Sequence, residues 1–241
     1  MNIAPFARRT LRGALSGAFF LAYGALGLAF APFLLLPVWP PRAIRGLIRF
    51  FYRAFVALAR ATSLFAVEMD GATRARLASA RGCVIAMNHI SLIDIVVLMA
   101  HLPDSTAVAK AATRRNPVLW PVVKRMFIVN DESPERIVAE VVRFLSEGVD
   151  VIVFPQGTRG GMRLHRGAAR FALAARAPLI PVRIAYDPTV LAKGQPWWDV
   201  GERTIRIRLE AGAAIPPEGP CDHATAAAIT EKLGRFCLSD R

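Results

Sequence analysis

The feature that most constrains this chain is an uncharged stretch near its N-terminus, which runs from Gly13 to Pro41. A helix needs about 20 apolar residues to cross a bilayer, so the stretch is long enough to span one. Pro32 and Pro37 are expected to interrupt the helix. Arginines lie on both sides of the stretch: Arg8, Arg9, Arg12, Arg42, Arg45 and Arg49. Because both ends are positive, the positive-inside rule gives no orientation. We therefore expect a helical hairpin that enters one leaflet and returns to the cytoplasmic face, with a single pass as the alternative.

The residues that follow predict a basic amphipathic helix. Five arginines share a stripe of roughly 80° at helical spacing: Arg42, Arg45, Arg49, Arg53 and Arg60. Because this helix directly follows a membrane-length stretch, we expect the stripe to rest on anionic lipid headgroups, with an ordinary solvated face as the alternative. Residues 1–62 are thus predicted to form membrane-anchoring or interfacial helices.

The charge of the chain indicates an anionic partner. The formal net charge is +13, and 27 of the 31 basic residues are arginine, which binds phosphate in a bidentate manner. A GC-rich genome would also explain the arginine bias. Nucleic acid fits the charge, but the sequence contains no helix-turn-helix, zinc-finger or aromatic-basic RNA motif, so we expect membrane lipid and no nucleic acid as the partner. The scattered cysteines, Cys83, Cys221 and Cys237, form no CxxC pair, which predicts reduced thiols and no metal site.

Residues 63–241 alternate short apolar strands with helices. The expected strands are 83–87, 126–129, 150–154, 179–186 and 204–210. The clearest helix is 134–147, which Ser133 can cap and Gly148 can terminate, and a last helix is expected at 222–238. This alternation predicts an α/β fold with a mostly parallel central sheet flanked by helices. We therefore expect one domain at residues 63–241, preceded by the N-terminal membrane-associated segment.

A histidine and an aspartate follow the strand 83–87, in the segment NHISLID. Open α/β sheets place their sites at the carboxyl ends of parallel strands. Residues five apart on an ideal helix diverge by about 140°, so His89 and Asp94 meet only if His89 lies in the turn and Asp94 lies one turn into the next helix. Asp94 would then hold one imidazole nitrogen and leave the other free to take a proton, as a general base does. The alternative is a turn histidine beside an unrelated capping aspartate.

The second candidate segment is FPQGTRGG, residues 154–161, which follows the strand 150–154. Its glycines let the backbone approach an anion closely, and Arg159 supplies charge-assisted hydrogen bonds. We therefore expect an anionic group to bind here. The alternative is a flexible glycine-rich turn with solvated arginines.

In this order the segments resemble the 1-acyl-glycerol-3-phosphate acyltransferase family of phospholipid synthesis. The landmarks are NHISLID at 88–94, the stretch 110–130, FPQGTR at 154–159 and LIPV at 179–182, and the resemblance covers residues 65 to 210. It implies that His89 is the general base and that Asp94 orients it. The residues expected to bind substrate are Asn88, Ser91, Lys110, Gln156, Gly157, Thr158 and Arg159.

The resemblance also implies the reaction and its place in the cell. An acyl group would pass from acyl-CoA or acyl-carrier protein to a lysophospholipid-like hydroxyl, in the first place that of 1-acyl-sn-glycerol-3-phosphate. Residues 63–241 would form the catalytic domain, held by the N-terminal helices at the cytoplasmic face of a bacterial inner membrane. No cofactor beyond the thioester co-substrate is expected, and the oligomeric state is left open.

The sequence departs from the family pattern at Gln156, where the family has Glu, and at Asn130, where it has Arg. Five basic residues are candidates to supply the missing positive charge: Lys110, Arg114, Arg115, Lys124 and Arg125. The alternatives are an acceptor without phosphate, such as a lyso-ornithine-type or other hydroxylated lipid, and a non-catalytic lipid-binding relative.

Overall fold

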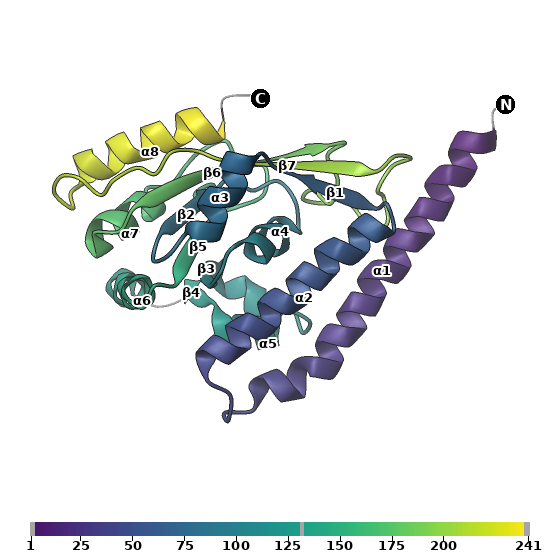
Figure 1. The fold of residues 1–241 in the computed structure, drawn as a ribbon, viewed down its shortest axis with the longest axis horizontal. Coiled ribbons are helices and arrows are strands. Elements are labelled where there is room, and N and C mark those ends of the chain that lie inside the picture. Colours follow the sequence, from purple (N-terminus) through teal and green to yellow (C-terminus); the bar gives the residue numbers. More distant parts are fainter. Residues whose placement is uncertain (1–2, 131–132, 239–241) are drawn as a thin grey trace.

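The computed structural model describes residues 3–130 and 133–238. Its centre is a seven-stranded sheet with the strand order β1-β7-β6-β2-β5-β3-β4 (Figure 1). The strands are β1 (Phe65–Glu68), β2 (Val84–Met87), β3 (Ser105–Lys110), β4 (Ile128–Asn130), β5 (Asp150–Val153), β6 (Leu179–Asp187) and β7 (Ile205–Ala211). All neighbours pair in parallel except β6 and β7. The predicted α/β fold with a mostly parallel sheet is confirmed.

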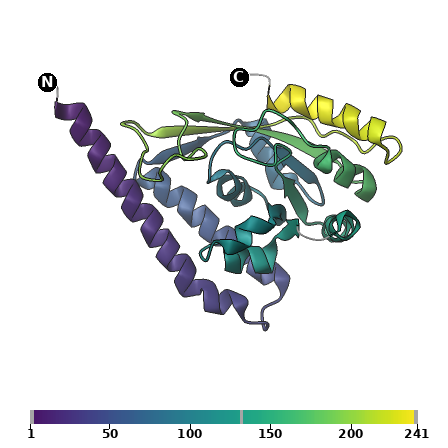
Figure 2. The same cartoon turned by 180° about the vertical axis from the view of Figure 1, so that it is seen from behind.

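Helices cover both faces of this sheet (Figures 1 and 2). They are α1 (Ile3–Leu35), α2 (Pro41–Ala61), α3 (Gly71–Ser79), α4 (Asp94–His101), α5 (Trp120–Met126), α6 (Pro134–Ser146), α7 (Gly167–Ala175) and α8 (His223–Cys237), with a 3-10 turn η1 (Ala111–Arg115) after β3. Apolar residues of α2, α3 and α4 pack on one face of the sheet, and those of α6, α7 and α8 pack on the other.

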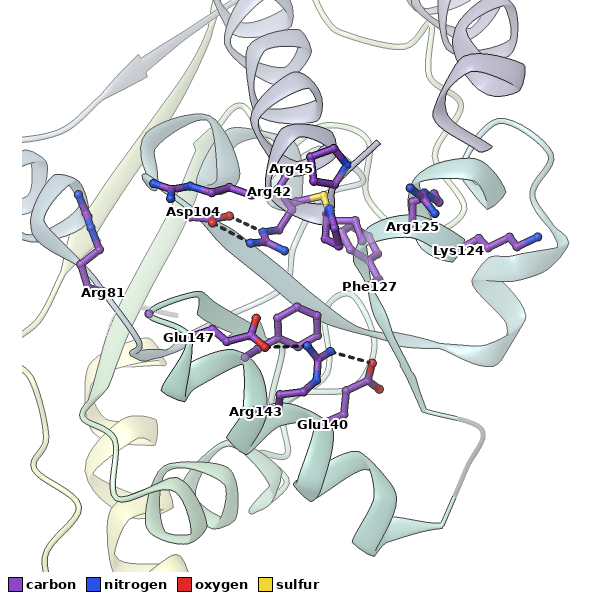
Figure 3. Close-up of a pocket in the computed structure, with 15 residues that line it drawn as sticks. Arg42, Arg45, Arg81, Asp104, Lys124, Arg125, Phe127, Glu140, Arg143 and Glu147 are labelled. Atoms are coloured by element: carbon purple, nitrogen blue, oxygen red, sulfur yellow. Dashed lines mark hydrogen bonds and ion pairs between the residues drawn. The ribbon is translucent and has the colours of Figure 1, made fainter. Parts of the chain in front are cut away.

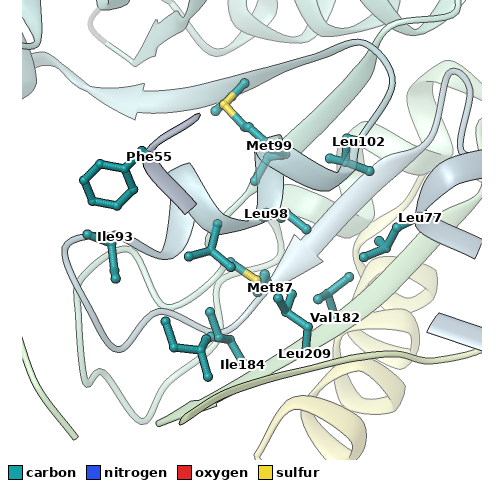
Figure 4. Packing of buried hydrophobic residues seen from close by; sticks show 14 of the residues in the cluster. Phe55, Leu77, Met87, Ile93, Leu98, Met99, Leu102, Val182, Ile184 and Leu209 are labelled. Carbon is teal, nitrogen blue, oxygen red and sulfur yellow. The ribbon is translucent and has the colours of Figure 1, made fainter. Parts of the chain in front are cut away.

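The strand β2 shows why the central strands consist of continuous apolar residues. Its successive side chains point to opposite faces, so Val84 and Ala86 join the cluster under α6, α7 and α8. Ile85 and Met87 join the cluster under α2, α3 and α4 (Figure 4). A strand with helices on both faces has no solvated side, so none of its positions favours a polar residue.

Most predicted elements are present near their expected bounds. The expected strands at 83–87, 150–154, 179–186 and 204–210 appear as β2, β5, β6 and β7. The strand expected at 126–129 begins only at Ile128, because Met126 still belongs to α5. Ser133 caps α6, accepting a hydrogen bond from the Arg136 N–H at 3.4 Å. The strands β1 and β3 were not predicted; β3 reads STAVAK, which is less apolar than its neighbours.

The N-terminal stretch forms one long helix that pairs with α2 as a helical hairpin (Figure 1). The interruption expected at Pro32 is wrong, since α1 continues through it to Leu35, whereas Pro37 lies in the turn that follows. The helical segment at residues 8–35 is long and apolar enough to cross a membrane. Only 11% of its 18-residue apolar window is buried inside the molecule. This is compatible with membrane association.

Polar contacts hold the first half of α1 against the rest of the molecule. Arg12 donates to the carbonyl oxygens of Ser63 and Leu64 at 3.0 and 3.2 Å. The Ser16 hydroxyl donates to the Trp197 carbonyl at 2.9 Å. The predicted boundary between residues 62 and 63 lies in the turn after α2, and the hydrophobic cluster extends across it.

The arginine stripe of α2 corrects one expectation, because much of it faces the domain and not a lipid surface. Arg45 is buried and forms a bidentate ion pair with Asp104, at 2.6 and 2.9 Å. Arg49 donates to the Pro103 carbonyl, and Arg53 donates to the Ala100 carbonyl at 3.0 Å. These acceptors lie at and just beyond the end of α4, where helix carbonyls lack intrahelical partners and the dipole attracts cations. Helical periodicity located the stripe but not the surface that it contacts.

A buried carboxylate at the start of β5 makes the stability of the fold depend on pH. Asp150 accepts the Cys83 N–H at 2.9 Å, and its second oxygen has no hydrogen-bond partner among the described residues. Burial raises the pKa of Asp150 from 3.8 to about 7. The native state thus favours the protonated form, and ionisation costs stability increasingly as pH rises through this window.

We expect Asp150→Asn to raise the melting temperature above pH 7 and to change it little near pH ~4, because asparagine keeps an acceptor for Cys83 and carries no charge. Thermal unfolding across this pH range measures the effect. The same change at the exposed Asp187 is the control and should give no such trend. An equal gain at both ends of the range would contradict the assignment.

Candidate active site

The two candidate loops lie side by side at one edge of the sheet. β2 pairs in parallel with β5 on one side and with β6 on the other. Residues 88–93 leave the carboxyl end of β2, and residues 154–161 leave the carboxyl end of β5. Adjacent parallel strands end at the same edge, so the sheet order alone brings these loops together.

The predicted contact between His89 and Asp94 is present. The His89 Nδ1 atom lies 2.7 Å from the Asp94 Oδ2 atom. Asp94 is the first residue of α4, and not one turn inside it as the spacing suggested. The turn after His89 folds back, so the same Oδ2 atom also accepts the backbone N–H groups of Ile90 and Ser91, at 2.7 and 3.0 Å.

These contacts determine which imidazole nitrogen can act as a base. A carboxylate that already accepts two N–H groups favours the tautomer with hydrogen on Nδ1, so the lone pair of His89 lies on Nε2. Asp94 is fully buried, whereas the His89 side chain keeps 22% of its surface exposed. The Phe154 ring stacks on the imidazole, with centroids 4.3 Å apart. The histidine is therefore fixed in orientation and still accessible.

Tyr186 on β6 completes the surroundings of Asp94, a role that no local sequence pattern indicates. Its hydroxyl donates to Asp94 Oδ1 at 2.6 Å. Burial, followed by the negative charge of Asp94, raises the pKa of Tyr186 well above its ordinary value, so the hydroxyl stays protonated and remains a donor. Tyr186 lies far along the chain, and only the pairing of β2 with β6 brings it here.

The backbone of His89 is held on both sides by the glycine-rich loop. Its N–H donates to the Gln156 side-chain oxygen, and its carbonyl accepts the Gly160 N–H at 2.8 Å. The Gln156 side-chain N–H donates in turn to the Gly161 carbonyl. Gln156 is buried, so its amide joins the two loops and does not face the open side where substrate contact was expected.

Asn88 and Ser91 also lie beneath the candidate site. The Asn88 amide donates to the Ile184 carbonyl at 2.9 Å and accepts the Ile184 N–H at 2.7 Å, as a strand residue would. Both Asn88 and Ser91 are buried. Direct contact with substrate, expected for both, would require these side chains to leave their present places. Here the Asn88 amide joins the residue before His89 to β6, and the backbone N–H of Ser91 binds Asp94.

Thr158 and Arg159 lie on the accessible part of the loop. Gly157 and Gly160 have φ of +65° and +73°, a conformation that favours glycine and produces the tight turn. Arg159 donates to the Leu191 carbonyl at 3.1 Å, which leaves further N–H groups of its guanidinium for another acceptor.

The candidate cations divide between opposite edges of the sheet. Lys110 ends β3 beside Asn130 of β4, and Arg114 and Arg115 follow in η1, all near the carboxyl edge. Lys124 and Arg125 instead line a cavity at the amino-terminal edge. That position contradicts the expectation that these two residues supply charge beside Arg159.

Removing the Tyr186 hydroxyl should destabilise the native state. We expect Tyr186→Phe to lower the free energy of unfolding by about 1–3 kcal/mol, because a buried oxygen of Asp94 loses its donor. Urea unfolding followed by circular dichroism measures the change. Tyr52→Phe, on α2, removes a hydroxyl that makes no hydrogen bond within the described part of the chain, and should change stability little. Equal effects of the two variants would show that the Asp94 contact contributes nothing.

Two acyltransferases are similar to this chain in sequence. The chain is 28% identical over 157 residues to 1-acyl-sn-glycerol-3-phosphate acyltransferase beta of Homo sapiens, covering 60% of this chain and 54% of that protein. It is 26% identical over 152 residues to an uncharacterized acyltransferase of Schizosaccharomyces pombe, covering 58% and 53%. The chain thus spans about half the length of these curated relatives.

A solved structure shows the same fold, and a family model covers the candidate site. The crystal structure of the 1-acyl-sn-glycerophosphate acyltransferase of Thermotoga maritima superposes with a TM-score of 0.69 at 21% identity, covering 97% of this chain and 98% of that one. The Acyltransferase family model matches residues 67–185, a range that contains His89, Asp94 and the glycine-rich loop. Residues 67–185 of this chain therefore belong to the Acyltransferase family.

Proposed function

We propose that this protein is an O-acyltransferase that moves a fatty acyl group from a thioester to the hydroxyl of a lysophospholipid-like acceptor. The observation that carries the proposal is the 2.7 Å contact between His89 Nδ1 and the buried Asp94, which leaves Nε2 accessible at the carboxyl edge of the sheet. The family match and the names of the relatives support the same reaction.

The proposed step is a direct transfer. His89 Nε2 takes the proton of the acceptor hydroxyl while that oxygen attacks the thioester carbonyl carbon. The tetrahedral intermediate then collapses, the carbon–sulfur bond breaks, and the thiolate leaves with the proton from the imidazolium. Asp94 stabilises the imidazolium that forms between these steps. General-base catalysis of this kind contributes about 10²- to 10⁴-fold in rate.

The acceptor that we propose first is 1-acyl-sn-glycerol-3-phosphate. Arg159 supports it, because its guanidinium is held by the Leu191 carbonyl and keeps further donors for a phosphate. Lys110 supports it too, since it lies beside Asn130, the position where the family has arginine. A non-phosphate lysolipid is the second candidate, favoured by the uncharged Asn130 itself. A non-catalytic lipid-binding role is the alternative that a turnover assay tests.

The proposed donor is acyl-CoA or acyl-carrier protein, and the proposed location is the cytoplasmic face of a bacterial inner membrane. The location is supported by α1, whose apolar residues are largely exposed. The catalytic chemistry proposed here uses side chains and the thioester, with no resident cofactor.

Replacing the histidine tests the mechanism. We expect His89→Ala to lower acyl transfer by at least about 10²-fold with the fold unchanged, because the general base is lost. The assay is mass spectrometry of the products formed by purified protein from acyl-CoA and mixed lysolipids, which also identifies the acceptor. His223→Ala, at the exposed start of α8, is the control and should retain full activity. Retention of most of the activity by His89→Ala would refute the general-base role.

Gln156→Glu tests whether this position selects the acceptor or holds the loops. Glutamate keeps an oxygen for the His89 N–H but places its other oxygen against the Gly161 carbonyl, where glutamine donates. We expect stability to fall by about 1–3 kcal/mol and turnover of phosphate and non-phosphate acceptors to fall by the same factor. Gln195→Glu changes a similar bridging amide in the β6–β7 loop and is the control. A selective gain with lysophosphatidate would instead assign Gln156 to acceptor recognition.

A further inference from the structure

A basic cavity lies at the edge of the sheet opposite to His89. It has a volume of about 710 Å³ and is bordered by α2, α5 and α6 (Figure 3). Arg81, Asp104 and Gly148, which line it, lie within three residues before the first residues of β2, β3 and β5. The cavity is therefore at the amino-terminal edge, separated from the candidate active site by the length of these strands.

The walls of this cavity carry more positive than negative charge. The charged residues that line it are Arg42, Arg45, Arg81, Lys124, Arg125, Arg143, Asp104, Glu140 and Glu147. Each acid contacts an arginine: Asp104 pairs with Arg45, and both glutamates approach Arg143, at 2.9 and 3.9 Å (Figure 3). Arg42, Lys124 and Arg125 have no carboxylate partner among the described residues. Arg81 likewise has no carboxylate partner among these residues, and its guanidinium donates to the Ala78 and Ala80 carbonyls. Four of the six cations that line the cavity are therefore not neutralised by a described carboxylate.

Arg125 has the clearest capacity to bind an anion at this cavity. One terminal N–H group of its guanidinium donates to the Trp39 carbonyl at 3.1 Å. Its Nε atom is buried and has no hydrogen-bond partner in the described part of the chain. A buried donor without an acceptor costs free energy, which an oxygen of a bound anion would recover. Pro40 and Pro41 also line the cavity, so the positive end of the α2 dipole lies beside it.

An apolar turn adjoins this basic cavity. Residues 36–40 connect α1 to α2, and their exposed side chains include Leu36, Val38 and Trp39. Val38 is 73% exposed, and several exposed apolar side chains gathered at one turn, unlike a single one, mark a surface that meets a partner or a membrane. The carbonyl that binds Arg125 belongs to this same turn. Apolar side chains next to cations are the arrangement of a surface that enters the acyl region while binding headgroups.

We propose that this cavity binds the phosphate group of an anionic membrane phospholipid, as a docking site distinct from the site of acyl transfer. Arg125 contacts the phosphate, Arg42 and Lys124 add positive charge on the two sides of the cavity, and the turn at residues 36–40 inserts its side chains beside the headgroup. The proposal rests on the membrane association of the protein proposed above and is independent of the acceptor that it acylates.

The test compares two triple variants of the full chain in vesicle sedimentation. The cavity variant carries Arg42→Gln, Lys124→Gln and Arg125→Gln. The control variant loses the same charge elsewhere, through Arg206→Gln, Arg208→Gln and Lys232→Gln, at exposed positions of β7 and α8. The vesicles are phosphatidylcholine alone, phosphatidylcholine with phosphatidylglycerol, and phosphatidylcholine with oleate at the same surface charge.

We expect the cavity variant to bind phosphatidylglycerol vesicles at least about tenfold more weakly than the parent protein, and the control variant to lose less than about threefold. Oleate vesicles should not separate the two variants, because a carboxylate lacks the phosphate geometry. Arg42→Gln alone, at an exposed position, should cost about fivefold and guards against misfolding of the triple variant.

Equal losses in both variants, or loss on oleate equal to that on phosphatidylglycerol, would overturn the proposal. The last measurement is the melting temperature in the presence of inorganic phosphate. If it raises the melting temperature of the parent but not of the cavity variant, while vesicle binding is unchanged between them, the ligand is free phosphate and the lipid assignment is wrong. Because every readout is binding and none is turnover, a failure here is distinguishable from a failure of the acyltransferase proposal.

Discussion

The carboxylate of Asp94 is the group on which the arrangement of this site depends. It is fully buried and accepts the His89 ring N–H, two backbone N–H groups and the Tyr186 hydroxyl. A buried charge is tolerated only when its oxygens are satisfied, and these donors come from β6 and from the turn after β2. The same bonds that make the charge acceptable also fix the imidazole, so the stability of the fold and the geometry of the candidate site are not separable at this residue.

The glycine-rich loop fixes the other side of the histidine. Gln156 and Gly160 bond the N–H and the carbonyl of His89, so the main chain at this position has no freedom to drift. These contacts exist because β5 is the direct neighbour of β2. The chain reaches the site three times, after β2, after β5 and along β6, and each passage contributes a different component.

Much of this was predictable from local sequence, and the failures share one cause. Continuous apolar runs indicated parallel strands, and the segment NHISLID indicated a histidine beside an aspartate. Tyr186 was missed because nothing near it in sequence distinguishes it from an ordinary core tyrosine. Arg45 was assigned to lipid because periodicity defines the stripe of a helix but not what covers it. Lys124 was expected to supply positive charge for the acceptor, but its place in the sequence does not say at which edge of the sheet it lies.

The loop between β6 and β7 has contacts on two sides. Its Leu191 carbonyl accepts both Arg159 and the Leu92 N–H, and its Trp197 carbonyl and Asp199 side chain bond Ser16 and Arg9 of α1. An insertion or deletion in this loop would therefore displace α1 and Arg159 together. Evolutionary change in the length of this segment is therefore constrained twice, once by its contacts with α1 and once by its contact with the loop that follows β5.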